Sequence, residues 1–271
     1  MGSLSHKIVI AGYGYVGKAI SSALKDTCDI TIVDPAFSTL TIKDTEPDGV
    51  IICVSTPQAD DGTCDVSNVI KVINETPKEV PILIKSTISL EGWERILQCI
   101  GSQRITFSPE FLRARTAIED FKNQKVMYVG HGATVYWSDL FLKSNPNLDI
   151  QTYDAEQLIL AKYFRNSFLA TKVSFFNQVY DLCKASGISF NEVREVITDD
   201  NRIGKSHSSV TEQRGYGGHC FPKDVSAIIE TGVWNNVDLS IINEASEYNT
   251  KLRYSEVEHF LFGGEDDNER N

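Results

Sequence analysis

The chain has 271 residues, of which 41% are hydrophobic and 23% are charged, so it is long enough for one large domain or two modest ones. Its formal net charge of −11 argues against general binding to nucleic acid or to a phosphate-rich membrane surface. No apolar run approaches a membrane span, and the start lacks the layout of a signal peptide. We therefore expect a cytoplasmic protein with six reduced cysteines, no paired-cysteine metal motif and no metal.

The chain opens with an apolar strand, residues 7–11, that leads into a glycine loop and then a helical pattern. Gly12 allows a tight turn, Gly14 allows a pyrophosphate to approach the backbone, and Gly17 allows the helix to pack against the strand. The motif alone is weak, but the strand before it and the helix after it favour a dinucleotide site. The expected cofactor loop consists of Gly12, Tyr13, Gly14, Tyr15, Val16 and Gly17.

A second strand, "DITIVD", ends at Asp34, 17 residues beyond Gly17. A carboxylate at that position can bind both hydroxyls of an adenosine ribose and repels a 2′-phosphate. No Arg or Lys follows within the next few residues, so the pattern favours NAD over NADP. A glycine-rich turn in some other α/β domain is the alternative interpretation.

Three more apolar strands follow, "GVIICVSTP", "VPILIKST" and "RITFSPEF", separated by helical stretches at roughly 67–75 and 89–100. Apolar strands that alternate with helices predict a parallel, doubly wound sheet covered on both faces. Polar residues at the carboxyl ends of such strands line the ligand crevice. The candidates are Ser55, Thr56, Thr87 and Glu110, although each alone can equally be a turn cap.

Residues 154–186 contain no Gly or Pro and predict one long helix, with a capping box at Asp154 and Gln157 and a stop at Gly187. Its apolar residues lie on nearly every face, so we expect it to be buried between partners. Lys162 and Asn166 are four residues apart and share a face. They either point at a developing oxyanion or play the ordinary roles of a snorkelling lysine and a backbone-bonded asparagine.

The segment "RGYGGHCFPKD", residues 214–224, places Cys220 just before a helix that Pro222 is suited to start. The positive end of the helix dipole and the nearby Lys223 both favour the thiolate, which is the nucleophile. Its glycines allow a substrate to approach the backbone. A buried structural cysteine is the alternative interpretation.

With these segments taken together, the chain resembles the UDP-glucose/GDP-mannose dehydrogenase family. The matching segments are "AGYGYVG", "CVSTP", "IKSTI", "SPEFLRARTAIEDF", "AKYFRNSFLATKVSFFN", "RIG" and "GYGGHCFPKD", in the order of the family. The resemblance implies a four-electron, NAD-dependent oxidation of a nucleotide sugar, with UDP-glucose first among the candidates. Two hydride transfers would flank a thiohemiacetal and a thioester on Cys220, and hydrolysis would release the uronate. It also implies a homodimer through the long helix.

The resemblance further implies roles for individual residues. Lys162 and Asn166 would stabilise the oxyanion, Asp224 would order water, and Glu110 would transfer protons. Thr87 would hold water beside the nicotinamide, and Lys223 would lie near the cofactor. The implied substrate-binding set is Glu110, Phe111, Leu112, Arg113, Lys162, Asn166, Tyr216 and Gly217.

Two departures from the family pattern stand out. Ala114 and Arg115 replace the usual Glu-Gly, so a carboxylate that borders substrate and cofactor is missing, and the sequence stops where the family continues into a UDP-binding third domain. The loop 205–215 carries polar donors that could bind a diphosphate in place of that domain, namely Lys205, Ser206, Ser208 and Arg214.

We predict an NAD domain at 1–152, a helical central and dimerisation domain at 153–262 and a polar tail at 263–271. A two-electron hydroxyacid dehydrogenase and a non-catalytic NAD-binding family member are the rival interpretations.

Overall fold

The structure is a computed structural model that describes residues 6–100, 104–218 and 220–262. The chain divides into two compact units, Met1–Lys162 and Tyr163–Asn271. That division falls ten residues beyond the boundary expected at 152, inside a helix, so the domain limits remain a prediction. The expected polar tail lies outside the described residues.

The first unit is built on a seven-stranded sheet with the order β2-β1-β3-β4-β5-β6-β7. Its strands are β1 (His6–Ala11), β2 (Cys28–Val33), β3 (Gly49–Ile52), β4 (Ile82–Ile84), β5 (Ile105–Phe107), β6 (Val126–Gly130) and β7 (Asp149–Tyr153). The first five strands in that order are parallel, which confirms the doubly wound fold. The sheet continues beyond the five predicted strands, where β6 pairs antiparallel with β5 and parallel with β7.

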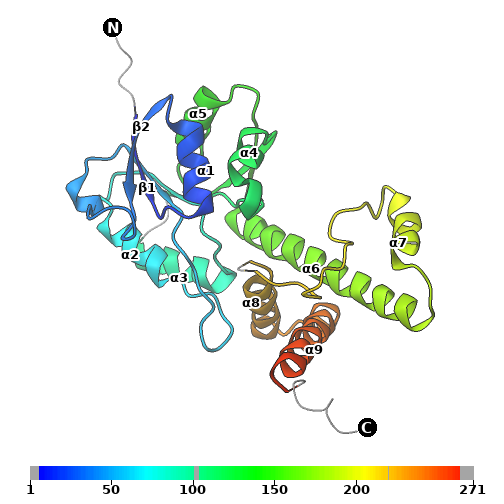
Figure 1. The fold of residues 1–271 in the computed structure, drawn as a ribbon. Coiled ribbons are helices and arrows are strands. Elements are labelled where there is room, and N and C mark those ends of the chain that lie inside the picture. Colours follow the sequence, from blue (N-terminus) through cyan, green and yellow to red (C-terminus); the bar gives the residue numbers. More distant parts are fainter. Residues whose placement is uncertain (1–5, 101–103, 219, 263–271) are drawn as a thin grey trace. The chain divides into compact units, whose positions relative to one another are not determined.

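Five helices pack on this sheet: α1 (Tyr15–Leu24), α2 (Ser67–Glu75), α3 (Leu90–Ile100), α4 (Ala117–Lys122) and α5 (Thr134–Ser144). Helices α1, α4 and α5 cover one face, and α2 and α3 cover the other (Figure 1). Short 3-10 turns lie at Ile42–Asp44 and Ala114–Thr116. The central strands β3 and β4 are apolar and fully buried because both of their faces are covered, whereas the edge strands β2 and β7 include polar residues and are partly exposed.

The second unit is helical. It takes most of α6 (Ala155–Ala185), together with α7 (Phe190–Asp199), α8 (Phe221–Trp234) and α9 (Ser240–Phe262). The Asp154 N–H donates to Gln157 Oε1 at 3.1 Å where α6 begins. At its other end Gly187 adopts φ +69°, and the Ile188 N–H donates back to the Cys183 carbonyl. Both predicted ends of the long helix are therefore confirmed.

Across the part of the chain that the structure describes, no helix combines the length and the apolarity needed to span a membrane.

Candidate active site

The glycine loop lies between β1 and α1, and its three glycines differ in what surrounds them. Gly12 adopts φ +93°, and a Cβ there would lie 2.6 Å from the Cys53 carbonyl carbon after β3. A Cβ on Gly17 would lie 2.2 Å from the Gly12 carbonyl oxygen. Gly14 caps α1 and has open space where a Cβ would be. The first and third glycines are thus required by packing, while Gly14 leaves room for a ligand at the start of the helix.

Asp34 follows β2 directly, and its carboxylate braces the glycine loop. It accepts the Tyr13 N–H at 2.6 Å and the Ala36 N–H at 2.8 Å. Each carboxylate oxygen can still accept a further hydrogen bond. Val16 is half-buried in α1, and the Tyr13 ring packs edge-on against Phe37.

The polar residues after β3 and β4 lie at the same edge of the sheet, because these strands are parallel. Ser55 is exposed, and its carbonyl accepts from the Asn68 side chain at 3.1 Å. Thr56 is buried. Thr87 is half-buried, and its carbonyl faces the Cys64 thiol at 3.5 Å. This edge is where doubly wound folds bind their ligands.

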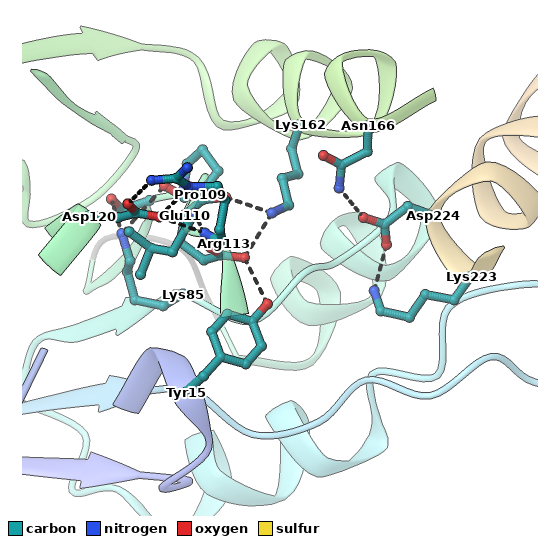
Figure 2. Close-up of polar contacts among 12 residues, drawn as sticks. Tyr15, Lys85, Pro109, Glu110, Arg113, Asp120, Lys162, Asn166, Lys223 and Asp224 are labelled. Atoms are coloured by element: carbon teal, nitrogen blue, oxygen red, sulfur yellow. Dashed lines mark hydrogen bonds and ion pairs between the residues drawn. The ribbon is translucent and has the colours of Figure 1, made fainter. Parts of the chain in front are cut away.

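Glu110 forms a buried ion pair with Lys162 of α6 (Figure 2). The ammonium lies 2.8 Å from Glu110 Oε1 and 2.5 Å from the Glu110 carbonyl oxygen. Glu110 Oε2 accepts the Leu112 N–H at 2.7 Å, and the Tyr15 hydroxyl lies 3.5 Å from Oε1. Burial alone raises the pKa of Glu110, but Lys162, the Leu112 N–H and Lys85 together lower it below its ordinary value.

Lys85 was not singled out from the sequence, although a lysine within the apolar run "VPILIKST" was a usable signal. Its ammonium is buried and donates to Ser108 Oγ at 3.1 Å and to the Pro109 carbonyl at 3.4 Å. Burial lowers the pKa of Lys85 to about 8, despite the opposing effect of Glu110. Two lysines, Lys162 and Lys85, therefore lower the pKa of Glu110.

The neighbours of Glu110 have different surroundings. The Phe111 ring lies 5.6 Å from the Lys162 ammonium. Arg113 is exposed and forms a two-pronged pair with Asp120, at 3.0 Å from Nε and 2.6 Å from Nη2 (Figure 2). Its guanidinium is therefore occupied by a carboxylate close in sequence, and a role in substrate binding stays a prediction.

In the second unit, Cys220 caps the start of α8 and is half-buried. Pro222 is in the first turn, one position later than expected, because Phe221 is the first helical residue. Asp224, one turn along, is fully buried and accepts from Asn166 Nδ2 at 2.6 Å and from Lys223 Nζ at 2.5 Å (Figure 2). Asn166, Lys223 and Asp224 thus form one hydrogen-bonded group at the helix end that carries the cysteine.

Tyr216 is buried and Gly217 is half-buried, in the loop that leads to Cys220. The suggestion that the donors of loop 205–215 bind a diphosphate fits poorly. Ser208 is buried between Arg194 Nε and the Lys205 carbonyl, and Arg214 donates to Asp181. These two side chains are already used inside the unit.

A strand, a glycine loop and a helix, with a carboxylate at the end of the next strand, together make a dinucleotide-binding domain, and the acidic residue is the kind that accepts NAD. The sequence model of the NAD binding domain of the UDP-glucose/GDP-mannose dehydrogenase family matches residues 36–136. The model of that family's central domain matches residues 156–251. The chain belongs to this family, and its cofactor is NAD.

Among its relatives, the UDP-glucose 6-dehydrogenase of Pseudomonas aeruginosa is 30% identical over 224 residues, which are 75% of this chain and 49% of that protein. The UDP-glucose 6-dehydrogenase of Campylobacter jejuni is 32% identical over 193 residues, 69% of this chain and 48% of that protein. The chain thus spans about half the length of the curated relatives it matches.

Solved structures show the same fold. A UDP-glucose dehydrogenase from Pyrobaculum islandicum aligns with a TM-score of 0.83 at 24% identity, covering 97% of this chain and 72% of that one. The Mycobacterium tuberculosis 3-hydroxyisobutyrate dehydrogenase aligns with a TM-score of 0.69 at 17% identity, covering 96% of this chain and all of that one. The fold by itself therefore does not separate these two kinds of dehydrogenase.

Proposed function

We propose that the chain oxidises C6 of a nucleotide sugar, UDP-glucose first among the candidates, to the uronate in two NAD-dependent steps. The observation that carries the proposal is Cys220 at the start of α8, one turn before the buried carboxylate that Asn166 and Lys223 hold. A two-electron dehydrogenase has no use for a thiol in that setting. The named relatives are UDP-glucose 6-dehydrogenases, which supports the choice of sugar nucleotide.

The proposed chemistry forms its covalent bond on the protein. Loss of a proton and a hydride turns the C6 alcohol into an aldehyde. The Cys220 thiolate adds to that carbonyl, and the oxygen takes a proton to give a thiohemiacetal; loss of that proton and of a second hydride gives a thioester. Water then adds, the thiolate leaves, and the acid is released as a carboxylate. NAD, when bound, accepts one hydride in each oxidation.

The buried polar groups supply proton transfer and charge stabilisation in this proposal. Lys162 and Asn166 carry donors that can turn to the oxygen on C6, where negative charge develops. Glu110 is held ionised by Lys162, so it can accept a proton from water. Movement of Lys162 from Glu110 to the substrate oxygen would raise the pKa of Glu110 and strengthen it as a base. Asp224 would order the attacking water.

The NAD site proposed here consists of the glycine loop 12–17, Asp34 and the polar strand ends. Gly14 and the start of α1 would receive the pyrophosphate, and Asp34 would bind the adenosine ribose. Ser55, Thr56 and Thr87 would border the remainder of the dinucleotide, and Lys223 would lie near it. The open space at Gly14 is what fits this ligand.

The test is the stoichiometry of the reaction. We expect two NADH per sugar oxidised and a product that gains a carboxylate, followed by absorbance and mass spectrometry with UDP- and GDP-sugars. The Pseudomonas aeruginosa UDP-glucose 6-dehydrogenase, which is about twice as long as this chain, serves as the positive control. One NADH and a free carbonyl product would place the chain among two-electron dehydrogenases. NAD binding without turnover of any sugar would make it a non-catalytic family member.

The nucleophile is tested separately with Cys220→Ser. We expect this variant to lose uronate formation while it binds NAD as the parent does, because the thiol lies outside the sheet unit that carries the glycine loop. Full four-electron turnover by Cys220→Ser would show that the nucleophile is misassigned.

Two properties of the whole protein follow from the proposal. We propose a homodimer through α6, because Phe164, Phe168, Phe175 and Leu182 leave much of their apolar surface exposed. We also propose a reducing, cytoplasmic setting. Its support is that Cys28, Cys53, Cys64, Cys183 and Cys220, the cysteines whose side chains the structure describes, form no disulfide.

A further inference from the structure

The loop that leads to the proposed nucleophile is held by two buried asparagines from different helices of the second unit. Asn177 of α6 accepts the Gly215 N–H at 3.2 Å and Arg214 Nε at 2.8 Å, both with Oδ1. Asn249 of α9 accepts the Tyr216 N–H at 2.6 Å and returns a hydrogen bond from Nδ2 to the Tyr216 carbonyl at 3.1 Å. The asparagines are 1% and 8% exposed. Two consecutive backbone N–H groups of a loop are thus bound by side chains.

Arg214 is fixed in turn by neighbours on the same two helices. Its Nη2 donates to Asp181 Oδ1 at 2.7 Å, and its guanidinium lies 4.8 Å from the Tyr180 ring centroid. The second oxygen of Asp181 accepts the Tyr248 hydroxyl at 2.8 Å. Arg214 adopts φ +48°, a left-handed conformation that non-glycine residues seldom take. Surrounding contacts must maintain that conformation, since strained backbone persists only where its neighbours determine it.

Gly215 makes the close approach of the second asparagine possible. It adopts φ +56°, and a Cβ there would lie 2.3 Å from Asn249 Oδ1. The next residue, Tyr216, is buried, and its ring packs 6.2 Å from the ring of Phe221, the first residue of α8. The hydrogen-bonded stretch is therefore linked by side-chain packing to the helix end that presents Cys220.

We infer that Asn177 and Asn249 are positioning residues, which fix the loop on the N-terminal side of Cys220 and so hold its thiol at the start of α8. The inference rests on the proposed function, which makes Cys220 the nucleophile. The other side of the cysteine is fixed by α8 itself, where Asp224 is bound by Asn166 and Lys223. Covalent catalysis needs such fixation, because a displacement of about 1 Å can cost on the order of a hundredfold in rate.

The first experiment uses the unmodified chain and measures amide hydrogen exchange at single-residue resolution. The Gly215 and Tyr216 amides should exchange far more slowly than their intrinsic rates, although both belong to a loop, because each donates to a buried asparagine oxygen. Exchange at intrinsic rates at both positions would overturn the inference without any variant. This experiment needs no turnover, so it is independent of the proposed function.

The second experiment compares Asn177→Ala, Asn249→Ala and Asn177→Asp with Asn243→Ala. Asn243 is half-buried on α9, and its side chain donates to Glu247 Oε1 at 2.9 Å. In Asn177→Asp a carboxylate oxygen still accepts from Arg214 and Gly215, so only the donor to the Val173 carbonyl is lost. We expect iodoacetamide to alkylate Cys220 several-fold faster in both alanine variants, and at the parent rate in the other two. Alkylation of Cys64, in the first unit, serves as the internal reference.

In turnover, kcat for the nucleotide sugar should fall by roughly ten- to a hundredfold in the alanine variants, with KM for NAD unchanged. Asn177→Asp should restore kcat. If the folded alanine variants match Asn243→Ala in both alkylation and kcat, the inference is wrong. A parent chain without turnover would refute the proposed function, while exchange and alkylation would still decide the positioning role. If an alanine variant does not fold, exchange in the unmodified chain and the behaviour of Asn177→Asp give the decision.

Discussion

Lys85 places an ammonium group inside the first unit, at the end of the strand that leads to Thr87. Two buried lysines, Lys85 and Lys162, share that region with one carboxylate, Glu110, so protonation of both lysines leaves a net positive charge there. Taking the charge of Lys85 out of water is costly, and its pKa falls to about 8 for that reason. A region of this kind favours any reaction step that brings negative charge to it.

The stability of the fold should report the titration of Lys85. The folded chain releases this proton near pH 8 and the unfolded chain releases it near 10.5, so the unfolded chain binds more protons between those values. The free energy of unfolding contributed by Lys85 therefore rises with pH across that window. Relative to Lys85→Met, the parent should gain up to about 3 kcal/mol.

Urea unfolding of both proteins between pH 7 and about pH 10 measures this difference, since groups common to the two proteins cancel. Lys125→Met, which removes an exposed lysine, is the matched control and should show no such trend. If the difference in the free energy of unfolding between the parent and Lys85→Met does not change with pH, the fold does not lower the pKa of Lys85.

Asp34 has two roles that a pair of variants can separate. Asp34→Ala should weaken NAD by about 1–2 kcal/mol, roughly five- to thirtyfold, because it removes a charge-assisted hydrogen bond to ribose. Asp34→Asn keeps an oxygen for the Tyr13 N–H and loses the charge, so it should lie between the parent and Asp34→Ala. Calorimetric titration gives the affinities. Tighter binding of NADP than NAD by the parent would contradict the assignment.

At the scale of elements, the loop between β1 and α1 contains two kinds of glycine. Gly12→Ala should destabilise the fold by more than about 1 kcal/mol, since the new methyl group meets backbone atoms after β3 and φ is +93°. Gly14→Ala should leave the melting temperature nearly unchanged, because its Cβ meets open space and φ is −70°.

The same two variants distinguish packing from ligand binding. Gly14→Ala should weaken NAD by about tenfold or more, because the methyl group occupies the space into which the pyrophosphate comes. Thermal unfolding and NAD titration on both variants provide the check. If Gly14→Ala binds NAD as tightly as the parent, the phosphates do not lie against this residue.

At the scale of the whole molecule, one exposed apolar stripe of α6 bears on assembly. Phe168, Phe175 and Leu182 are seven residues apart and expose 68%, 54% and 69% of their surface. A spacing of seven keeps side chains on one face of a helix, as in paired helices. The partner contact proposed for α6 is therefore confined to the one face of the helix that carries these three side chains.

We expect a dimer in sedimentation experiments, and we expect the double variant Phe168→Lys/Phe175→Lys to dissociate it. Each aromatic residue buried at the centre of an interface contributes about 2 kcal/mol or more, about thirtyfold in the dissociation constant. Val196→Lys, at an exposed apolar position on α7, is the control and should remain dimeric. A monomeric parent, or a dimeric double variant, would contradict the assignment of this face.

Patterns close in sequence determined much of the fold and some of the site. Apolar runs bounded by turns predicted β1 to β5, and the absence of Gly and Pro predicted α6 with both of its ends. The glycine spacing and the carboxylate of Asp34 predicted the cofactor loop. Cys220 before a proline-containing first turn predicted a thiol at a helix start. Each depends on backbone preferences or on a period within a few residues, and such information is present in a single sequence.

The tertiary structure decided the partners of the charged and polar groups. Glu110 meets Lys162 across 52 residues, and Asn249 meets Tyr216 across 33. The sequence offers Arg214 as a phosphate ligand, but in the structure it donates to Asp181. The reversal of β6 was likewise not visible in its apolar pattern. Hydrogen bonds and ion pairs between distant residues produce no periodicity along the chain. Which buried donor finds which acceptor is therefore settled only when the elements pack and every desolvated polar group requires a partner.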